Sequence, residues 1–166
     1  DLQPSTLSVE VLTCLRFLQP EIHEEDIELR APFELLDQEQ LIDVEVDSDQ
    51  LRQAVFNVVR NAMDALREAP QPRIIHLRFG KDARWAFVEF TDSGPGLHSD
   101  VADGLFEPFV TGKSGGTGLG LSLTQQIIEA HGGSVRVEST SEPLGGAMFR
   151  VELPLIDGSS PEAVER

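Results

Sequence analysis

Three polar residues recur along one predicted helix, and their side chains suit metal and phosphate chemistry. Asn57, Asn61 and Asp64 are spaced by four and three residues, so at about 100° per residue they lie on one helix face. A buried asparagine needs a partner, because an unpaired amide costs about 1–3 kcal/mol. Asn61 offers a neutral oxygen to Mg²⁺, which usually completes its coordination shell with waters and substrate phosphates. The alternative is that these amides bond local backbone and help to pack a turn.

Two glycine-rich segments follow this helix, and the first begins with an acidic residue. In DSGPG at 92–96, Asp92 is acceptor-only when ionised. Asp92 can therefore receive the exocyclic amine of adenine, whereas guanine offers a carbonyl there, and this difference predicts selection for adenine. Gly94 and Gly96 turn the chain sharply beside it. The alternative is an Asx-type turn residue with no ligand.

The second segment, GGTGLGL at 115–121, opens a predicted helix. Gly116, Gly118 and Gly120 have no side chains, so phosphate oxygens can approach backbone N–H groups where the helix dipole also favours negative charge. Apolar residues recur every four positions from 119 to 127, and Gly132-Gly133 provides a stop. A glycine-rich linker to the helix is the alternative.

The predicted helices and strands must hold these groups together. The polar row runs between two apolar surfaces of its helix, and Asp92 stands at the end of an alternating strand. Helices interspersed with a largely antiparallel sheet predict an α/β two-layer sandwich. The first half of the chain is expected to form a helix at about 5–18, strands near 26–33 and 42–46, and the helix at 49–66. A hairpin of two strands, 74–79 and 84–92, follows around a turn at 80–83. After the helix that begins with the glycines, we expect strands 134–139 and 147–155, joined through Gly145-Gly146.

Four motifs in this order resemble those of the GHKL ATPases with the Bergerat fold, and in particular the catalytic and ATP-binding domain of sensor histidine kinases. The resemblance covers nearly all of the chain, and it implies a mixed, mostly antiparallel sheet with about three helices on one face. The segments are NVVRNAMDA at 57–65 (N box), DSGPG at 92–96 (G1 box), LFEPF at 105–109 (F box) and GTGLGL at 116–121 (G2 box).

The resemblance also implies roles for individual residues. Asn61 would be the Mg²⁺ ligand, Asp92 would bind the adenine amine, and Gly94 and Gly96 would lie beneath the base. The segment from about 98 to 115 would be a mobile ATP lid. The ATP-binding residues expected in this way are Asn61, Asp64, Asp92, Gly94, Gly96, Lys113, Gly116, Thr117, Gly118, Leu119 and Gly120.

Asn57 separates branches of this superfamily. Gyrase-type and MutL-type members carry a glutamate four residues before the metal-binding asparagine, as the base that activates water. An amide cannot take that proton, so hydrolysis loses its general base while ATP and Mg²⁺ binding remain. The substitution favours phosphotransfer, which needs mainly positioning and charge neutralisation. We take Asn57, Asn61 and Lys113 as the candidate catalytic residues.

Asp64 departs from the commonest histidine kinase pattern, which has lysine or arginine there. The N-A-x-D-A form and the stretch at 106–121 resemble the nitrogen-regulation subfamily. Phosphate charge must then be met elsewhere, and Lys113 and Arg60 are the candidates. A solvated Lys113 without a ligand is the alternative.

Composition limits the function classes. The chain has 166 residues, 40% of them hydrophobic, which suits one domain at 1–156 with a flexible tail at 157–166. Its net charge of −16 argues against nucleic acid as a partner, because binding to nucleic acid needs clustered Lys and Arg. No run approaches the roughly 20 apolar residues of a membrane span. The single Cys14, a predicted core residue, fits a reducing compartment, so we expect a cytoplasmic domain without direct membrane contact.

Several local motifs resemble known sites but are better explained otherwise. TGKS at 111–114 lacks the glycine that a P-loop requires, since Glu107 stands there. His23-Glu24 follows Pro20 and precedes a strand-like segment, which predicts a surface turn. His131, before two glycines, is predicted to be a helix cap.

The resemblance implies partners outside this chain. These are the helical dimerisation domain that carries the phosphorylated histidine, and a downstream response regulator. No H-E-x-x-x-P segment occurs in the sequence, so we expect a fragment of a longer, homodimeric kinase. Two alternatives stay open, namely an ATPase that drives conformational change and a nucleotide-sensing module without kinase activity.

Overall fold

The computed structural model describes residues 1–39, 41–96, 119–140 and 144–156. The predicted tail at 157–166 lies outside the described residues. In order, the elements are β1 (Gln3–Ser5), α1 (Leu7–Glu24), β2 (Ile27–Arg30), the 3₁₀ helix η1 (Phe33–Asp37), β3 (Val44–Val46), α2 (Ser48–Leu66), β4 (Arg73–Lys81), β5 (Trp85–Asp92), α4 (Leu119–Ala130), β6 (Ser134–Ser139) and β7 (Ala147–Pro154).

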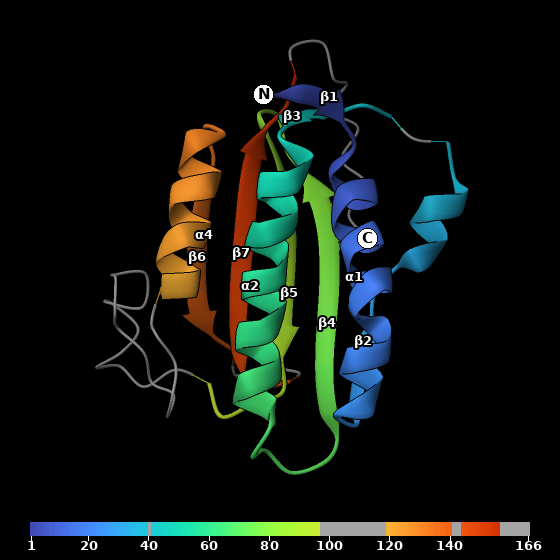
Figure 1. The fold of residues 1–166 in the computed structure, drawn as a ribbon, viewed down its shortest axis with the longest axis vertical. Coiled ribbons are helices and arrows are strands. Elements are labelled where there is room, and N and C mark those ends of the chain that lie inside the picture. Colours follow the sequence, from blue (N-terminus) through green and yellow to red (C-terminus); the bar gives the residue numbers. More distant parts are fainter. Residues whose placement is uncertain (40, 97–118, 141–143, 157–166) are drawn as a thin grey trace.

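The main sheet has five strands in the order β2-β4-β5-β7-β6. Among the described strands of this sheet, the β2–β4 pair is parallel and the other three pairs are antiparallel. Helices α1, α2 and α4 cover one face of this sheet (Figure 1). A separate antiparallel pair, β1 and β3, forms at one end. The predicted two-layer α/β sandwich with a mixed, mostly antiparallel sheet is therefore confirmed.

The core forms between the sheet and the helices because the apolar periodicities of both layers coincide. In β5, Ala86, Val88 and Phe90 belong to the core cluster with the apolar stripe of α2. The intervening Phe87 lies on the other face, opposite Gly80 in β4. The guanidinium of Arg150 lies 3.7 Å from the centroid of its ring, a cation–π contact that covers it. The alternation predicted for this strand is confirmed.

Helix α1 extends six residues beyond its predicted end and contains Pro20. An internal proline costs about 3 kcal/mol, but Leu18 and Ile22 are 3% and 1% exposed, and burying two such side chains contributes about 3–6 kcal/mol. The predicted surface turn at His23-Glu24 is wrong, because both residues form the last turn of the helix. Cys14 is buried as predicted.

Candidate functional site

Three elements bring the described site residues together: the middle of α2, the turn after β5 and the first turn of α4 (Figure 1). Asn57 of α2 is hydrogen-bonded to Gly120 of α4. Gly94, in the turn after β5, packs against Ala65 near the end of α2. Residues separated by up to 63 positions in sequence thus form one site.

Asp92 ends β5 as a buried carboxylate, 2% exposed. Its Oδ1 accepts the N–H groups of Gly94 at 2.8 Å and Ala147 at 3.3 Å. Both hydrogen bonds that the described residues make to this carboxylate reach Oδ1. Burial raises the pKa of Asp92, and the two backbone donors oppose that rise by stabilising the charged form. The structure therefore holds a hydrogen-bond acceptor in a fixed position.

Glycines surround Asp92 because there is no room for side chains. A Cβ on Gly94 would lie 2.9 Å from Oδ1 of Asp92 and 3.4 Å from the carbonyl oxygen of Ala65. A Cβ on Gly146 would collide with both the carbonyl and the carboxylate oxygens of Asp92. Gly96 has a φ of +79°, a conformation that glycine adopts without steric cost. The close approach of Gly146 was not predicted from the sequence, which indicated only a hairpin loop there.

Ser93 fixes this turn to the sheet, a role that was not predicted from the sequence. Its hydroxyl accepts the N–H of Ile74 at 2.8 Å and donates to the carbonyl of Pro72 at 3.2 Å. Its own N–H donates to the carbonyl of Ile74 at 3.0 Å. The only sequence signal is a serine directly after Asp92, and that signal does not identify a partner about 20 residues upstream.

Asn57 connects the two helices of the site. Its Nδ2 donates to the carbonyl oxygen of Gly120 at 3.1 Å, and the Thr124 hydroxyl donates to the same oxygen at 2.9 Å. Thr124 is fully buried and was not singled out from the sequence. A glutamate at position 57 has no N–H to donate. The contact therefore requires an amide, or another donor, where related ATPases are expected to carry a base.

Asn61 and Asp64 continue the polar row toward the end of α2. Asn61 is half-buried and makes no hydrogen bond with the other described residues. Asp64 pairs with Arg67 at 3.1 Å, and Arg67 also reaches Glu25 at 3.4 Å. The negative charge of Asp64 is thus partly offset within its own helix.

His131, directly after the last residue of α4, links the end of that helix to the start of α2. Its Nδ1 lies 2.7 Å from the carbonyl of Ile127, and its Nε2 lies 3.0 Å from the N–H of Asp47. Because a carbonyl only accepts and an N–H only donates, Nδ1 carries the proton and Nε2 accepts. Asp47 is the N-cap of α2 and accepts the N–H of Gln50. The predicted capping role is confirmed, and His131 also bridges the two helices.

Most of the remaining predicted residues lie outside the part of the chain that the structure describes. The lid, the F box, Lys113, Gly116, Thr117 and Gly118 lie outside the described residues, and Leu119 is the first residue of α4. Within the described residues, no three His, Cys, Asp or Glu side chains gather as a metal cluster. A cation at Asn61 would therefore need ligands from a bound phosphate or water, which is the usual mode for Mg²⁺.

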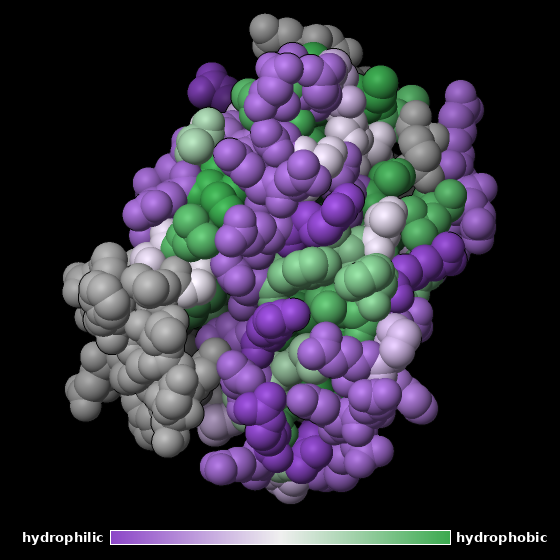
Figure 2. Space-filling view, in the orientation of Figure 1, coloured by the Kyte–Doolittle hydropathy of each residue, from purple (hydrophilic) through white to green (hydrophobic). Residues whose placement is uncertain are grey.

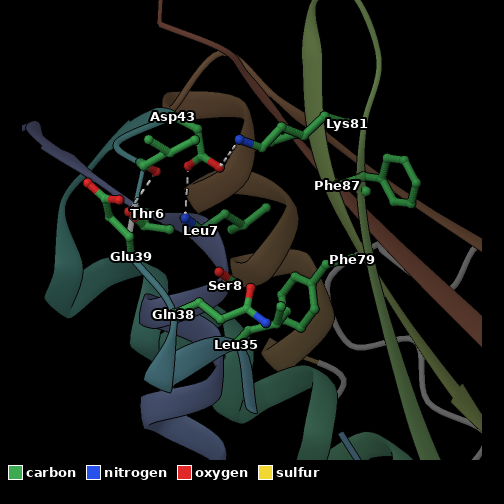
Figure 3. A pocket seen from close by; sticks show the side chains of 13 residues that line it. Thr6, Leu7, Ser8, Leu35, Gln38, Glu39, Asp43, Phe79, Lys81 and Phe87 are labelled. Carbon is green, nitrogen blue, oxygen red and sulfur yellow. Dashed lines mark hydrogen bonds and ion pairs between the residues drawn. The ribbon is translucent and has the colours of Figure 1, made fainter. Parts of the chain in front are cut away.

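A cavity of about 180 Å³ lies elsewhere, between the start of α1, the segment after η1 and the β4–β5 hairpin (Figure 3). There the Asp43 carboxylate accepts the N–H of Leu7 and pairs with Lys81, both at 3.0 Å. None of the predicted site residues lines this cavity. Asp43 ties the first turn of α1 to the sheet, so its role is structural.

No helix in the described ranges has both the length and the apolar character that crossing a bilayer requires.

The sequence matches the family model described as histidine kinase-, DNA gyrase B- and HSP90-like ATPase over residues 46–157. The sensory histidine kinase/phosphatase NtrB of Vibrio alginolyticus is 38% identical over 125 residues, which cover 70% of this chain and 35% of NtrB. The sensor histidine kinase ZraS of Salmonella typhimurium is 32% identical over 155 residues, 93% of this chain and 32% of ZraS. The chain spans about a third of the length of these relatives.

Solved structures of the same family share the fold. The catalytic domain of histidine kinase ThkA superposes with a TM-score of 0.75 at 26% identity, covering 93% of this chain and 97% of that domain. Full-length ShkA in complex with AMPPNP gives a TM-score of 0.72 at 26% identity, and the match covers 97% of this chain and 32% of ShkA. ThkA in complex with the response regulator TrrA gives a TM-score of 0.71 at 25% identity, and the match covers 96% of this chain and 43% of the ThkA chain.

Proposed function

The chain belongs to the family of histidine kinase-, DNA gyrase B- and HSP90-like ATPases, and from this premise we propose that it is the ATP-binding catalytic domain of a two-component sensor histidine kinase. In the proposed reaction the γ-phosphate of ATP passes to a histidine on a helical dimerisation domain outside this chain. A response regulator would then receive the phosphoryl group. The observation that carries the proposal is the site around Asp92, Asn57 and Gly120.

Asp92 is the proposed adenine contact. Oδ1 is already bonded to two backbone N–H groups, so Oδ2 is the proposed acceptor of the exocyclic amine. Because the carboxylate is buried, a guanine carbonyl opposite it would leave two acceptors unpaired, at a cost of about 1–3 kcal/mol. This arrangement supports adenine over guanine, with Gly94 and Gly96 providing space beneath the base.

Asn57 supports phosphotransfer over hydrolysis. Its Nδ2 donates to the carbonyl of Gly120, so the residue aligns the first turn of α4, where the phosphates are expected, and takes no proton from water. Asn61 is the proposed Mg²⁺ ligand, and the ion would supply neutralising charge to the phosphates when bound. We also propose that Lys113 and the glycines at 116 and 118 contact the phosphates.

The parent protein is proposed to be a cytoplasmic or membrane-anchored homodimer whose catalytic domain lies in the cytoplasm. The ThkA–TrrA complex and the kinase relatives support a response regulator as the downstream partner. The net charge of −16 argues against nucleic acid in this role.

Mg·ATP-dependent thermal stabilisation tests the site. Asn61→Ala and Asp92→Ala should each abolish the stabilisation, while Asp49→Asn, a carboxylate change at a side chain 94% exposed, should leave it unchanged. Unchanged shifts in both site variants would reject the assignment.

A second measurement separates kinase from hydrolase. Steady phosphate release by the isolated domain at a rate typical of enzymes, about 10 s⁻¹, would favour an ATPase and contradict the role given to Asn57. Transfer of the γ-phosphate to a histidine of the parent protein, with negligible phosphate release, is the result that we expect.

A further inference from the structure

Hydrogen bonds tie α4 to α2 near both ends of α4. At the start of α4, the Asn57 amide of α2 donates to the carbonyl of Gly120 at 3.1 Å. At the other end, Nε2 of His131 accepts the N–H of Asp47, the N-cap of α2, at 3.0 Å. The two helices lie side by side and run in opposite directions (Figure 1), so each bond joins one end of α4 to a different turn of α2.

The spacing of these contacts is nearly the same on both helices. Asp47 and Asn57 are ten residues apart, which is about 15 Å of helix. Gly120 and His131 are eleven residues apart, which is about 16 Å. A short helix that is bonded to its neighbour near both ends cannot slide or tilt without breaking a bond. The bond at His131 therefore helps to fix the first turn of α4, at the opposite end of the helix.

The acceptor of this bond is held firmly at the end of α4. The N–H of Gly133 donates to the carbonyl of Ile128 at 3.0 Å, a bond typical of the Schellman motif that ends many helices. A Cβ on Gly133 would collide with the carbonyl oxygen of Glu152 in β7, so the chain after His131 lies closely against the sheet.

The donor is held as firmly at the start of α2. Asp47 directly follows β3, and Val46 of that strand pairs with Gln3 of β1. The carboxylate of Asp47 also accepts the N–H of Gln50 in the first turn of α2. His131 thus connects α4 to a point that both a strand and a helix keep in place.

The ring of His131 is shielded from water and each of its nitrogens has a separate task. Hydrophilic residues make up much of the helical face in Figure 2, yet His131 is 5% exposed. Its Nδ1 donates to the carbonyl of Ile127 at 2.7 Å, which satisfies a carbonyl at the end of the helix. Capping needs only that nitrogen. The contact from Nε2 to Asp47 does not help to end α4, and it is this contact that carries the inference.

We propose that His131 is a positioning residue for phosphate binding: through Asp47 it fixes α4 on α2, and so holds the first turn of α4 where the ATP phosphates bind. Asp92 contacts the base from the end of β5, so the base end of the nucleotide does not depend on this bond. The inference rests on the proposed function, because it takes the first turn of α4 to be the phosphate site.

Two substitutions at position 131 separate the two contacts. The amide of glutamine reaches the place of Nε2 and accepts from Asp47, whereas the shorter asparagine reaches only the place of Nδ1. His131→Asn should weaken Mg·ATP binding about tenfold, a coupling of the size usual between distant sites, and leave adenosine binding unchanged. His131→Gln should keep the wild-type affinity for both ligands. The matched control is His76→Asn at an exposed histidine of β4, which should change neither affinity.

Isothermal titration calorimetry of this chain with Mg·ATP and with adenosine measures these affinities. Equal losses of Mg·ATP affinity in His131→Asn and His131→Gln would refute the proposal, because the cap and not the link to α2 would then matter. A parallel loss of adenosine affinity, or an unchanged Mg·ATP affinity in His131→Asn, would refute it as well. If the wild-type chain binds no Mg·ATP, the proposed function itself fails.

Substitutions at Asp47 test the same bond from α2, even if His131→Asn does not fold. Asp47→Pro removes the N–H that His131 accepts, at a φ of −88° that proline nearly matches. Asp47→Ala removes the same carboxylate but keeps the N–H. The proline variant should bind Mg·ATP about tenfold more weakly than the alanine variant, with equal adenosine affinities. Equal Mg·ATP affinities in the two variants would overturn the proposal.

Discussion

Replacing Gly146 with alanine should both destabilise the domain and remove its affinity for ATP. The new Cβ would collide with the carbonyl and carboxylate oxygens of Asp92, so β7 must move away or the carboxylate must turn. Either movement breaks the 3.3 Å bond from Ala147 to Asp92. Overpacking costs about 1–3 kcal/mol, and losing a hydrogen bond to a charged group costs about 1.5–3 kcal/mol. We expect a total of roughly 3–5 kcal/mol.

Gly145 provides a matched control one residue away. Its φ is +76°, and a Cβ there would meet no atom within 4 Å. Alanine at 145 should therefore lower the free energy of unfolding only by the cost of the left-handed backbone conformation, about 1–2 kcal/mol. Asparagine, which tolerates this conformation better, should cost less than alanine. The two neighbouring glycines thus separate a steric requirement from a conformational one.

Urea unfolding with and without Mg·ATP measures both effects. At 100 times the dissociation constant, a ligand stabilises the folded state by about 2.7 kcal/mol. The Gly145 variants should keep that increment and Gly146→Ala should lose it. The reasoning is refuted if Gly146→Ala unfolds within 1 kcal/mol of Gly145→Ala, or if it retains the full increment.

Three further results are expected. Because burial raises the pKa of Asp92, the folded state binds this proton more readily than the unfolded chain, whose Asp pKa is about 3.9. The resulting stability is present at low pH and is lost as pH rises through the folded-state pKa, so Asp92→Asn should flatten the pH profile of the urea midpoint in that window. Asn57→Asp replaces the donor to Gly120 by an acceptor and should cost about 1–2 kcal/mol; a midpoint equal to wild type would show that the contact is dispensable. Phe17→Ala removes only a stacked, exposed ring and should cost about 0.5–1.5 kcal/mol; a loss above about 3 kcal/mol in the same assay would mark Phe17 as a core residue.

Periodicity predicted the fold well because each layer buries one face. The spacing of Leu51, Val55 and Val58 and the alternation in β5 each allow one arrangement against a core. The end of α1 was missed because a local proline rule was outweighed by the burial of Leu18 and Ile22, a tertiary effect that no local pattern reports.

The site was only partly predictable, because residue types identify chemistry but not partners. Asp92 and Asn57 were recognised as polar groups in the right elements. Their partners, the N–H of Ala147 and the carbonyl of Gly120, are backbone atoms that carry no sequence signal. For the same reason Ser93 and Thr124 were overlooked, since serine and threonine are common at the surface and in helices.

The ring of His131 can serve as an intrinsic reporter of helix alignment. Its two nitrogens have fixed and different roles, one donating to Ile127 and one accepting from Asp47. A ¹⁵N spectrum distinguishes a protonated from an unprotonated ring nitrogen, so a change in this tautomer would signal that α4 has slid or tilted on α2. The reporter stands 11 residues, or about 16 Å of helix, from Gly120. It allows movement of α4 to be followed from its far end, with no label placed near Gly120.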